Sequence, residues 1–370
     1  MRIAILNSVA MASFILLSSL SHTNQMCADG CPAPSFAAPR TFDAGTNPVS
    51  VAVGDLNRDG KIDLVTADWQ YSGVVSVLLG NGDGNFQTVV NYSAGRFPQF
   101  VAVADFNGDG KPDLAVANYG SANISVLLGK GDGAFQTAVN YGAGTGPQSV
   151  AVGDINGDGK PDLVVANALS GNVSLLLGKG DGTFQTAVSY GAGQWPSSVA
   201  IGDFNGDDKL DLAVAYEFFS VISVLLGNGD GTFRTPINYP AGGYPFSLAV
   251  GDFNGDEKLD LAVANQVIDF SAPAHITVLL GNGDGTFQAA VSYGPGGDSV
   301  AVCDLNGDGT PDLTVANDGG VSVRLGKGDG TSRAPSTSAQ EGLPWPWVTS
   351  TATANPIWRW PRATRGSRCC

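Results

Sequence analysis

The stretch Asp55-Leu-Asn-Arg-Asp-Gly-Lys-Ile-Asp63 decides the fold, because close copies of it return five more times along the chain. The later copies occupy residues 105–113, 154–162, 203–211, 252–260 and 304–312. They follow one another at a spacing of about 50 residues, and a fixed period in this range marks a repeat architecture. The contents of one unit therefore predict the architecture of the whole domain.

Each unit contains four short apolar runs separated by turn residues. In the third unit these runs are 149–152, 162–166, 173–177 and 184–190. They are rich in Val, Leu and aromatic residues and bounded by Gly, Asn and Asp, which indicates strands and not helices. The sequence therefore predicts an all-β protein, a β-propeller built from four-stranded blades of about 50 residues each. A solenoid of stacked β-coils is the rival, but its coils are usually shorter, and the tight Asn-Gly-Asp-Gly turns favour hairpins.

The composition excludes several other classes of protein. The 370 residues are 43% hydrophobic and only 14% charged, with 51 glycines, which excludes a coiled coil, a collagen and a disordered acidic tail. The 34 acidic residues outnumber the 19 basic ones, and the net charge of −15 disfavours nucleic acid as a partner. Cations are the expected partners.

The N-terminus has the pattern of an export signal. Arg2 precedes an apolar run over residues 3–20, which is followed by a polar stretch over 21–25. We predict a signal peptide at 1–26 and a short linker at 27–35, and hence a secreted or cell-surface protein without stable membrane insertion, because no other apolar run approaches membrane-spanning length. A buried helix or a retained membrane anchor is the alternative. Cys27 and Cys31 could form a local disulfide outside the cell.

The two ends of the repeat region bear on the number of blades. Residues 36–45 match the fourth-strand pattern, and we expect them to complete the last blade of the propeller at 36–331. After Thr331 the pattern stops, since Ser332 stands where a Phe is expected. Moving the reading frame by one base allows the tail at 332–370 to encode a further copy of the repeat. We therefore interpret it as a frameshifted blade of a seven-bladed ancestor, which leaves either a strained six-bladed ring or an open one.

The acidic loops carry the chemistry of a calcium site. In the copy at 105–113, positions 1, 3, 5 and 9 have oxygen-bearing side chains, position 7 offers its backbone carbonyl, and a sharp turn at position 6 brings alternate residues together. Hard oxygen donors without His or Cys select Ca²⁺, and three carboxylates this close would repel one another without a cation. The alternative is an Asx-rich turn that needs no ion.

We predict about one Ca²⁺ per repeat, held at positions 1, 3, 5, 7 and 9 of every copy. Copies four and five carry Asp208 and Glu257 at position 6 instead of Gly, so their turns should form less readily. A second acidic series in Gly-Asp-Gly, represented by Asp181, is assigned to hairpin turns. The predicted calcium residues are Asp55, Asn57, Asp59, Lys61, Asp63, Asp105, Asn107, Asp109, Lys111, Asp113, Asp154, Asn156, Asp158, Lys160, Asp162, Asp203, Asn205, Asp207, Lys209, Asp211, Asp252, Asn254, Asp256, Lys258, Asp260, Asp304, Asn306, Asp308, Thr310 and Asp312.

The repeats resemble FG-GAP or VCBS repeats, the blade units of integrin-α-type propellers and of many secreted bacterial proteins. The resemblance rests on the calcium motif at Asp55, Asn57, Asp59 and Asp63 and on its five later copies, and it covers about residues 36–331. It implies a calcium-stabilised propeller with a role in adhesion or ligand binding. It does not identify the ligand.

The variable loops are the expected recognition surface. Because strands alternate in direction, the calcium loops and the Gly-Asp-Gly hairpins share one rim, and the other connections share the opposite rim. These other loops differ between units and carry aromatic residues, which suits binding of carbohydrate or of an extracellular protein. The alternative is that the aromatic rings only pack between blades. The candidate ligand-binding residues are Trp69, Tyr71, Phe97, Tyr119, Trp195, Tyr216, Phe218 and Tyr244.

The sequence contains no convincing catalytic constellation. Its histidines are His22, in the predicted signal peptide, and His275. Cys303 replaces a glycine of the repeat and is expected to be a buried small residue. We therefore expect a binding module and not an enzyme. A polysaccharide lyase or hydrolase acting through Tyr216 and Glu217 is the alternative, and a passive envelope scaffold is a third possibility.

Overall fold

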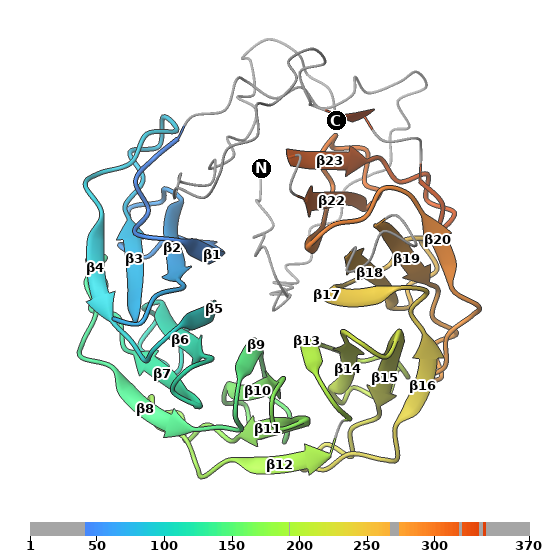
Figure 1. The fold of residues 1–370 in the computed structure, drawn as a ribbon, viewed down its shortest axis with the longest axis horizontal. Coiled ribbons are helices and arrows are strands. Elements are labelled where there is room, and N and C mark those ends of the chain that lie inside the picture. The colour runs from blue at the N-terminus through green and yellow to red at the C-terminus, as the bar shows by residue number, and fades with distance from the viewer. Residues whose placement is uncertain (1–40, 192, 267–273, 318–319, 333–335, 338–370) are drawn as a thin grey trace.

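The computed structural model describes residues 41–191, 193–266, 274–317, 320–332 and 336–337. These residues form six four-stranded antiparallel sheets, and in each sheet the strands lie in chain order. Figure 1 shows the sheets as blades arranged around a common axis, with the first strand of each blade innermost. The predicted all-β propeller of four-stranded blades is confirmed.

The blades have the following strands. Blade 1 has β1 (Pro48–Gly54), β2 (Asp63–Asp68), β3 (Val74–Leu78) and β4 (Val90–Ser93), and blade 2 has β5 (Pro98–Ala104), β6 (Asp113–Asn118), β7 (Asn123–Leu127) and β8 (Val139–Gly142). Blade 3 has β9 (Pro147–Gly153), β10 (Asp162–Asn167), β11 (Asn172–Leu176) and β12 (Val188–Gly191), and blade 4 has β13 (Pro196–Gly202), β14 (Asp211–Tyr216), β15 (Val221–Leu225) and β16 (Ile237–Pro240). Blade 5 has β17 (Tyr244–Gly251), β18 (Asp260–Gln266), β19 (His275–Leu279) and β20 (Val291–Tyr293), and blade 6 has β21 (Ser299–Cys303), β22 (Asp312–Asn317), β23 (Gly320–Arg324) and β24 (Ser336–Thr337).

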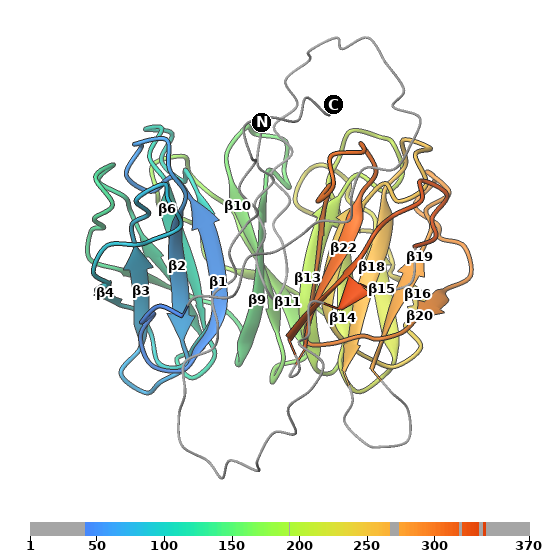
Figure 2. The same ribbon diagram turned by 90° about the horizontal axis from the view of Figure 1, so that it is seen from above.

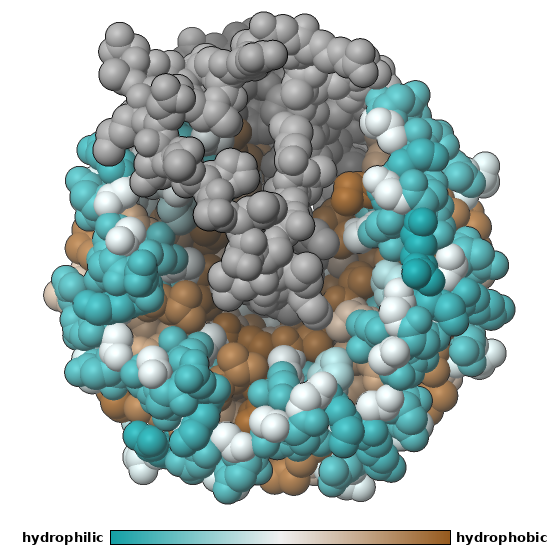
Figure 3. Space-filling view, turned by 180° about the vertical axis from the view of Figure 1, so that it is seen from behind, coloured by the Kyte–Doolittle hydropathy of each residue, from teal (hydrophilic) through white to brown (hydrophobic). Residues whose placement is uncertain are grey.

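The strands of a blade differ in burial because the blades pack face to face. In blade 3, β10 is buried at every residue, whereas the outermost strand β12 is mostly exposed. Hydrophobic clusters fill the seam between each pair of consecutive blades, from blades 1 and 2 to blades 5 and 6. Figure 3 shows hydrophobic residues toward the centre of one face and hydrophilic residues toward its periphery. The core is therefore a series of seams between blades.

The connections between strands form two rims at opposite ends of the blades (Figure 2). We call the rim with the β1–β2 and β3–β4 connections, and their equivalents in other blades, the acidic rim. The rim with the β2–β3 and β4–β5 connections and their equivalents is called the aromatic rim. This division follows from the alternating strand directions in each sheet.

The N-terminal segment was predicted to complete the last blade. In the described residues it does not, so this prediction is wrong. The fourth position of blade 6 is taken by β24, where Ser336 pairs with Val323 and Thr337 with Ser322. Residues 41–45 form no strand. β24 follows β23 after a short connection, whereas the N-terminal segment lies at the other end of the chain, and neighbours in the sequence pair more often. Among the described residues no hydrophobic cluster joins blade 6 to blade 1, and Figure 1 shows these two blades apart.

The described end of the N-terminal segment nevertheless packs as the end of a preceding fourth strand would. The Phe42 ring lies 5.1 Å from the Phe86 ring, edge to face. The equivalent pair between blades 1 and 2 is Tyr92 and Phe135, at 5.4 Å. Ala44 also belongs to a hydrophobic cluster with Leu64 and Leu78 of blade 1. Phe42 therefore occupies the position of a fourth-strand tyrosine.

Several predictions from the sequence lie outside the described residues. They are the signal peptide at 1–26, the linker at 27–35 with Cys27 and Cys31, the start of the N-terminal strand at 36–40, and most of the tail, at 338–370. Within the part of the chain that is described, no helix is long and apolar enough to span a bilayer.

Candidate functional site

Each acidic loop is a compact turn in which side-chain oxygens accept backbone N–H bonds. In blade 2, Asp105 Oδ2 accepts from Gly110 N at 2.7 Å, and Asn107 Oδ1 accepts from Asp109 N at 3.0 Å. Asp109 Oδ1 in turn accepts from Lys111 N at 3.0 Å. The bonds at positions 3 and 5 recur in all six loops. The side chains at positions 1, 3 and 5 thus hold the loop in a compact turn.

The aspartate at position 9 connects the acidic loop to the neighbouring hairpin. Asp113 is fully buried; its Oδ2 accepts from Phe106 N at 2.9 Å and its Oδ1 from Gly129 N at 2.7 Å. The same pair of bonds occurs in the other five blades. Position 9 is therefore a structural clamp between two loops, a role that the calcium motif alone did not predict.

Burial and contact with a lysine shift the pKa values of the acidic groups in opposite directions. Desolvation raises the pKa of Asp162 to about 6, with further contributions from the nearby Asp158 and Asp154 carboxylates. At position 5, the hydrogen bond with the Lys160 ammonium lowers the pKa of Asp158. Lysines at position 7 make the same contact in blades 1, 2 and 5, and a longer one of 3.7 Å in blade 4. The carboxylates at positions 1, 5 and 9 thus lie within electrostatic reach of one another.

Position 6 requires a left-handed backbone. Gly110 and Gly159 have φ of 75° and 79°. Asp208 and Glu257 adopt the same conformation, with φ of 61° and 65°, although their Cβ atoms disfavour it. The turns of loops four and five therefore form at the expense of local strain, as the sequence predicts.

The residues of each loop fit a calcium ion by their donor chemistry. Every loop offers three carboxylates, one amide oxygen and a position-7 carbonyl, and an oxygen that accepts one N–H bond keeps a second lone pair. Within the ranges that the structure describes, however, no three His, Cys, Asp or Glu side chains are grouped as a metal site. Calcium binding at these residues stays a prediction. It would require the lysines at position 7 to break their contacts with the carboxylates at position 5.

The second acidic series has the geometry of hairpin turns. Asp181 Oδ1 accepts from Thr183 N at 2.9 Å and from Thr183 Oγ1 at 2.6 Å. The same bonds form at Asp230, Asp284 and Asp329. These carboxylates are exposed at the surface, which agrees with their assignment as turn residues.

An aromatic cluster lies on the aromatic rim at the seam between blades 1 and 2. The Trp69 ring is 5.1 Å from Phe97 and 5.3 Å from Tyr119, and Tyr71 is 6.0 Å from Phe97. Arg96 lies 5.2 Å from the centre of the Tyr71 ring and donates from Nη1 to its hydroxyl at 3.0 Å. Tyr71 is 66% exposed. We call these five residues the first aromatic cluster.

A second aromatic cluster, Trp195 and Phe218, lies on the same rim at the seam between blades 3 and 4. Their rings are 5.4 Å apart and edge to face, and they are 37% and 45% exposed. Tyr216, also predicted to bind ligand, is only 4% exposed and packs in the core between these blades, because it is the last residue of β14 and faces inward. The half-buried Tyr244 begins β17 in the next seam and belongs to neither cluster.

Phe97 and Trp195 occupy equivalent positions with an unusual backbone. Their φ angles are 50° and 57°. The equivalent residues in blades 1 and 3 are Asn47 and Gly146, which tolerate positive φ. In both aromatic cases the carbonyl accepts an N–H bond from the loop after the second strand, from Tyr119 at 3.0 Å and from Glu217 at 3.1 Å. A signal existed in the sequence, since each of these residues precedes a proline and the equivalent residues before Pro48 and Pro147 are Asn and Gly.

Two groups considered for catalysis have altered acidities. Burial raises the pKa of Glu217, and burial together with the Glu217 charge raises the pKa of Tyr119. Burial raises the pKa of the Cys303 thiol to about 12, so the thiol is protonated at neutral pH. Cys303 thus has the character of a packing residue and not of a nucleophile.

The repeats match a known family model. The FG-GAP-like repeat model matches residues 55–116, 105–165, 154–214, 209–263 and 267–315, which together span well over half of the chain. The chain belongs to the FG-GAP-like repeat family. No curated protein matches this FG-GAP-like protein.

Solved structures share its propeller fold. An Agrocybe aegerita lectin that recognises non-reducing terminal N-acetylglucosamine has a TM-score of 0.58 at 22% identity, over 80% of this chain and 81% of the lectin. The BP39L lectin from Burkholderia pseudomallei has a TM-score of 0.60 at 15% identity, over 80% and 86%. A putative 6-phosphogluconolactonase from Bacteroides uniformis has a TM-score of 0.55 at 12% identity, over 78% and 93%. At these identities the likeness shows the fold alone.

Proposed function

We propose that this FG-GAP-like protein is an exported, calcium-binding propeller that binds neutral carbohydrate on its aromatic rim. One observation carries the proposal: two bulky aromatic residues, Phe97 and Trp195, are held at positive φ on this rim. A non-glycine residue in this conformation costs on the order of 1–3 kcal/mol, and such strain is concentrated at ligand-binding sites. Asn47 and Gly146 show that the fold itself does not require an aromatic side chain there.

The chemistry of the clusters favours a sugar as ligand. Exposed aromatic faces suit the apolar C–H face of a pyranose ring, while Arg96 and the Tyr71 hydroxyl can hydrogen-bond its hydroxyl groups. The net charge of −15 disfavours anionic glycans. The presence of two lectins among the similar folds supports the same class of ligand.

Calcium has a structural part in this proposal. An ion in each acidic loop would neutralise the carboxylates at positions 1, 5 and 9 and hold the loop closed against its hairpin. The aromatic rim lies at the far end of the strands, so an ion would act on the ligand site through the rigidity of the blades. Export through the predicted signal peptide would bring the protein to millimolar calcium and to extracellular glycans.

A retention assay on a panel of neutral polysaccharides tests the proposal. Phe218→Ala should weaken retention at least tenfold, while Leu169→Ala, at the equivalent exposed position in blade 3, should leave it unchanged. Retention by no glycan would contradict the proposal. New reducing or unsaturated sugar ends would instead identify an enzyme, and they should not appear.

A further inference from the structure

The seam between blades 5 and 6 lacks two hydrophobic side chains that fill the other seams. Between blades 4 and 5 these are Leu279 and Phe287, buried at 0% and 7% exposure. In blade 6 the equivalent positions are Arg324 on β23 and Ser332 after the hairpin. Among the described residues, Tyr293 therefore has no phenylalanine partner of the kind that Tyr239 has in Phe287, at 5.5 Å. Replacing a phenylalanine by a serine at such a site leaves a void.

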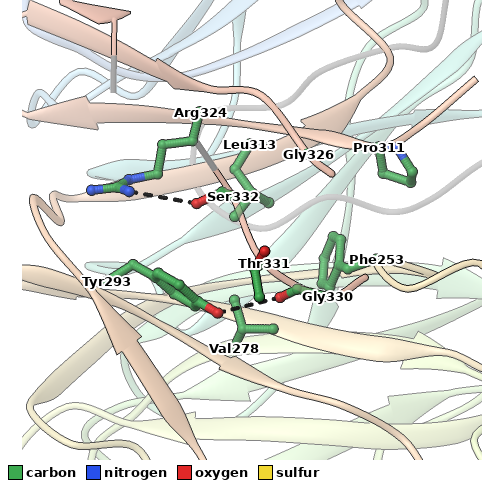
Figure 4. Close-up of a pocket in the computed structure, with 10 residues that line it drawn as sticks. All are labelled: Phe253, Val278, Tyr293, Pro311, Leu313, Arg324, Gly326, Gly330, Thr331 and Ser332. Atoms are coloured by element: carbon green, nitrogen blue, oxygen red, sulfur yellow. Dashed lines mark hydrogen bonds between the residues drawn. The ribbon is translucent and has the colours of Figure 1, made fainter. Parts of the chain in front are cut away.

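A small cavity occupies this position (Figure 4). Its walls are the apolar side chains of Phe253, Val278 and Leu313 together with Tyr293, Arg324 and Ser332. The volume open to the centre of a water molecule is about 10 Å³, which is room for a single particle of that size. In Figure 4 dashed lines mark the hydrogen bonds from the Arg324 guanidinium to Ser332 and from the Tyr293 hydroxyl to Gly330.

Among the described residues, the guanidinium at this cavity has no counter-charge. Arg324 is 4% exposed. Within the part of the chain that the structure describes, its Nε–H has no hydrogen-bond partner, and its Nη1 donates to Ser332 Oγ at 3.5 Å. Among the described residues no carboxylate forms an ion pair with it. A buried cation without a counter-ion is strongly unfavourable, and burial accordingly lowers the pKa of Arg324.

We propose that a single chloride-sized anion binds in the seam between blades 5 and 6, held by the Nε–H of Arg324 and the hydroxyl of Ser332. An anion supplies both the missing acceptor and the missing negative charge, whereas a water molecule supplies only the acceptor. The apolar walls and the small volume exclude sulfate and carboxylates of organic size. This site is independent of the carbohydrate-binding proposal, because it lies inside a seam and not on the aromatic rim.

Melting curves at constant ionic strength test this site. Replacing sodium gluconate by sodium chloride, from 1 to 100 mM chloride, should raise the melting temperature by about 2–4 °C. Arg324→Leu restores the residue of the other repeats, so it should fold and should abolish the chloride dependence. The matched control is Arg234→Leu, which removes an exposed arginine and should leave the dependence intact.

Diffraction from crystals soaked in bromide gives a second readout. An anomalous peak beside Arg324 Nε is expected in the parent protein and not in Arg324→Leu. The proposal is overturned if chloride stabilises Arg324→Leu as much as the parent, if gluconate and chloride act alike, or if the seam shows no bromide.

Discussion

The acidic and aromatic rims sit at opposite ends of the same strands, yet one is almost invariant and the other is different in every blade. On the acidic rim, the position-9 aspartate makes the same two hydrogen bonds six times, with Oδ1 to glycine N distances of 2.7–2.9 Å. On the aromatic rim, the position of Phe97 is Asn47 in blade 1 and Gly146 in blade 3. Backbone groups that must be satisfied constrain the first rim, and no such demand constrains the side chains of the second.

Of the changes that distinguish the two rims, removal of calcium should lower the stability of the protein the most. At a free ion concentration 100 times Kd, each loop would contribute about 2.7 kcal/mol to the free energy of unfolding. Adding a chelator should therefore lower the melting temperature by more than about 10 °C, measured by calorimetry. A protein whose melting temperature and ion content both ignore the chelator would show that the acidic rim is a set of plain Asx turns.

Asp162→Ala should destabilise the protein by about 4 kcal/mol, because it leaves Ile155 N and Gly178 N buried without an acceptor. Urea unfolding with a chelator present separates this loss from any loss of calcium. Asp181→Ala, in the exposed hairpin of the same blade, is the matched control and should cost less than about 1 kcal/mol. Equal effects of the two variants would refute the clamp.

Asp68→Asn probes the variable end of a blade. Asp68 is buried, accepts from Ser76 Oγ at 2.6 Å and from Thr66 Oγ1 at 3.0 Å, and takes the position of Asn118 in blade 2. Desolvation raises its pKa from 3.8 to about 6. The folded state thus prefers the protonated carboxyl, so its stability falls as pH rises from about 4 to 6 and stays lower above that range.

Near pH 8 the ionised Asp68 should destabilise the fold by about 3 kcal/mol, taken from a shift of roughly two pKa units. Asp68→Asn should recover most of this and flatten the pH dependence of urea unfolding between pH 4 and 8. The reciprocal variant Asn118→Asp should introduce the same pH dependence into blade 2. If Asp68→Asn lowers stability at pH 8, the carboxylate has a partner that this account lacks.

Glu257→Gly should have the smallest effect and should be stabilising, by about 1 kcal/mol, because glycine adopts the left-handed conformation at position 6 without a Cβ clash. Gly159→Ala should destabilise blade 3 by a similar amount. Thermal melts of the two variants measure the difference. A stability loss in Glu257→Gly would mean that the glutamate side chain contributes something specific to loop five.

Much of the fold could be predicted from the sequence, because the repeat encodes its own local structure. The acidic loop and the hairpin glycines mark the strand ends in each unit, so the four-stranded blades and the two rims follow. Loop strain at Asp208 and Glu257 could also be predicted, since the other copies have glycine there.

Other features depend on neighbours that a repeat does not reveal. Tyr216 ends a strand and turns into the core, although its sequence context suggests an exposed loop. The two hydrogen bonds of Asp162 require the hairpin 16 residues further along to lie beside it. The fourth strand of blade 6 is β24, because local pairing prevails over closure by the distant N-terminus. All three features depend on contacts with residues outside the local sequence.

Diffraction from one crystal, grown with calcium and soaked with a retained neutral sugar, tests the division between the rims most directly. We predict ion density inside the acidic loops and sugar density against Trp69, Phe97 or Trp195 on the aromatic rim. Sugar bound at the acidic rim, or acidic loops without ions at millimolar calcium, would contradict the account.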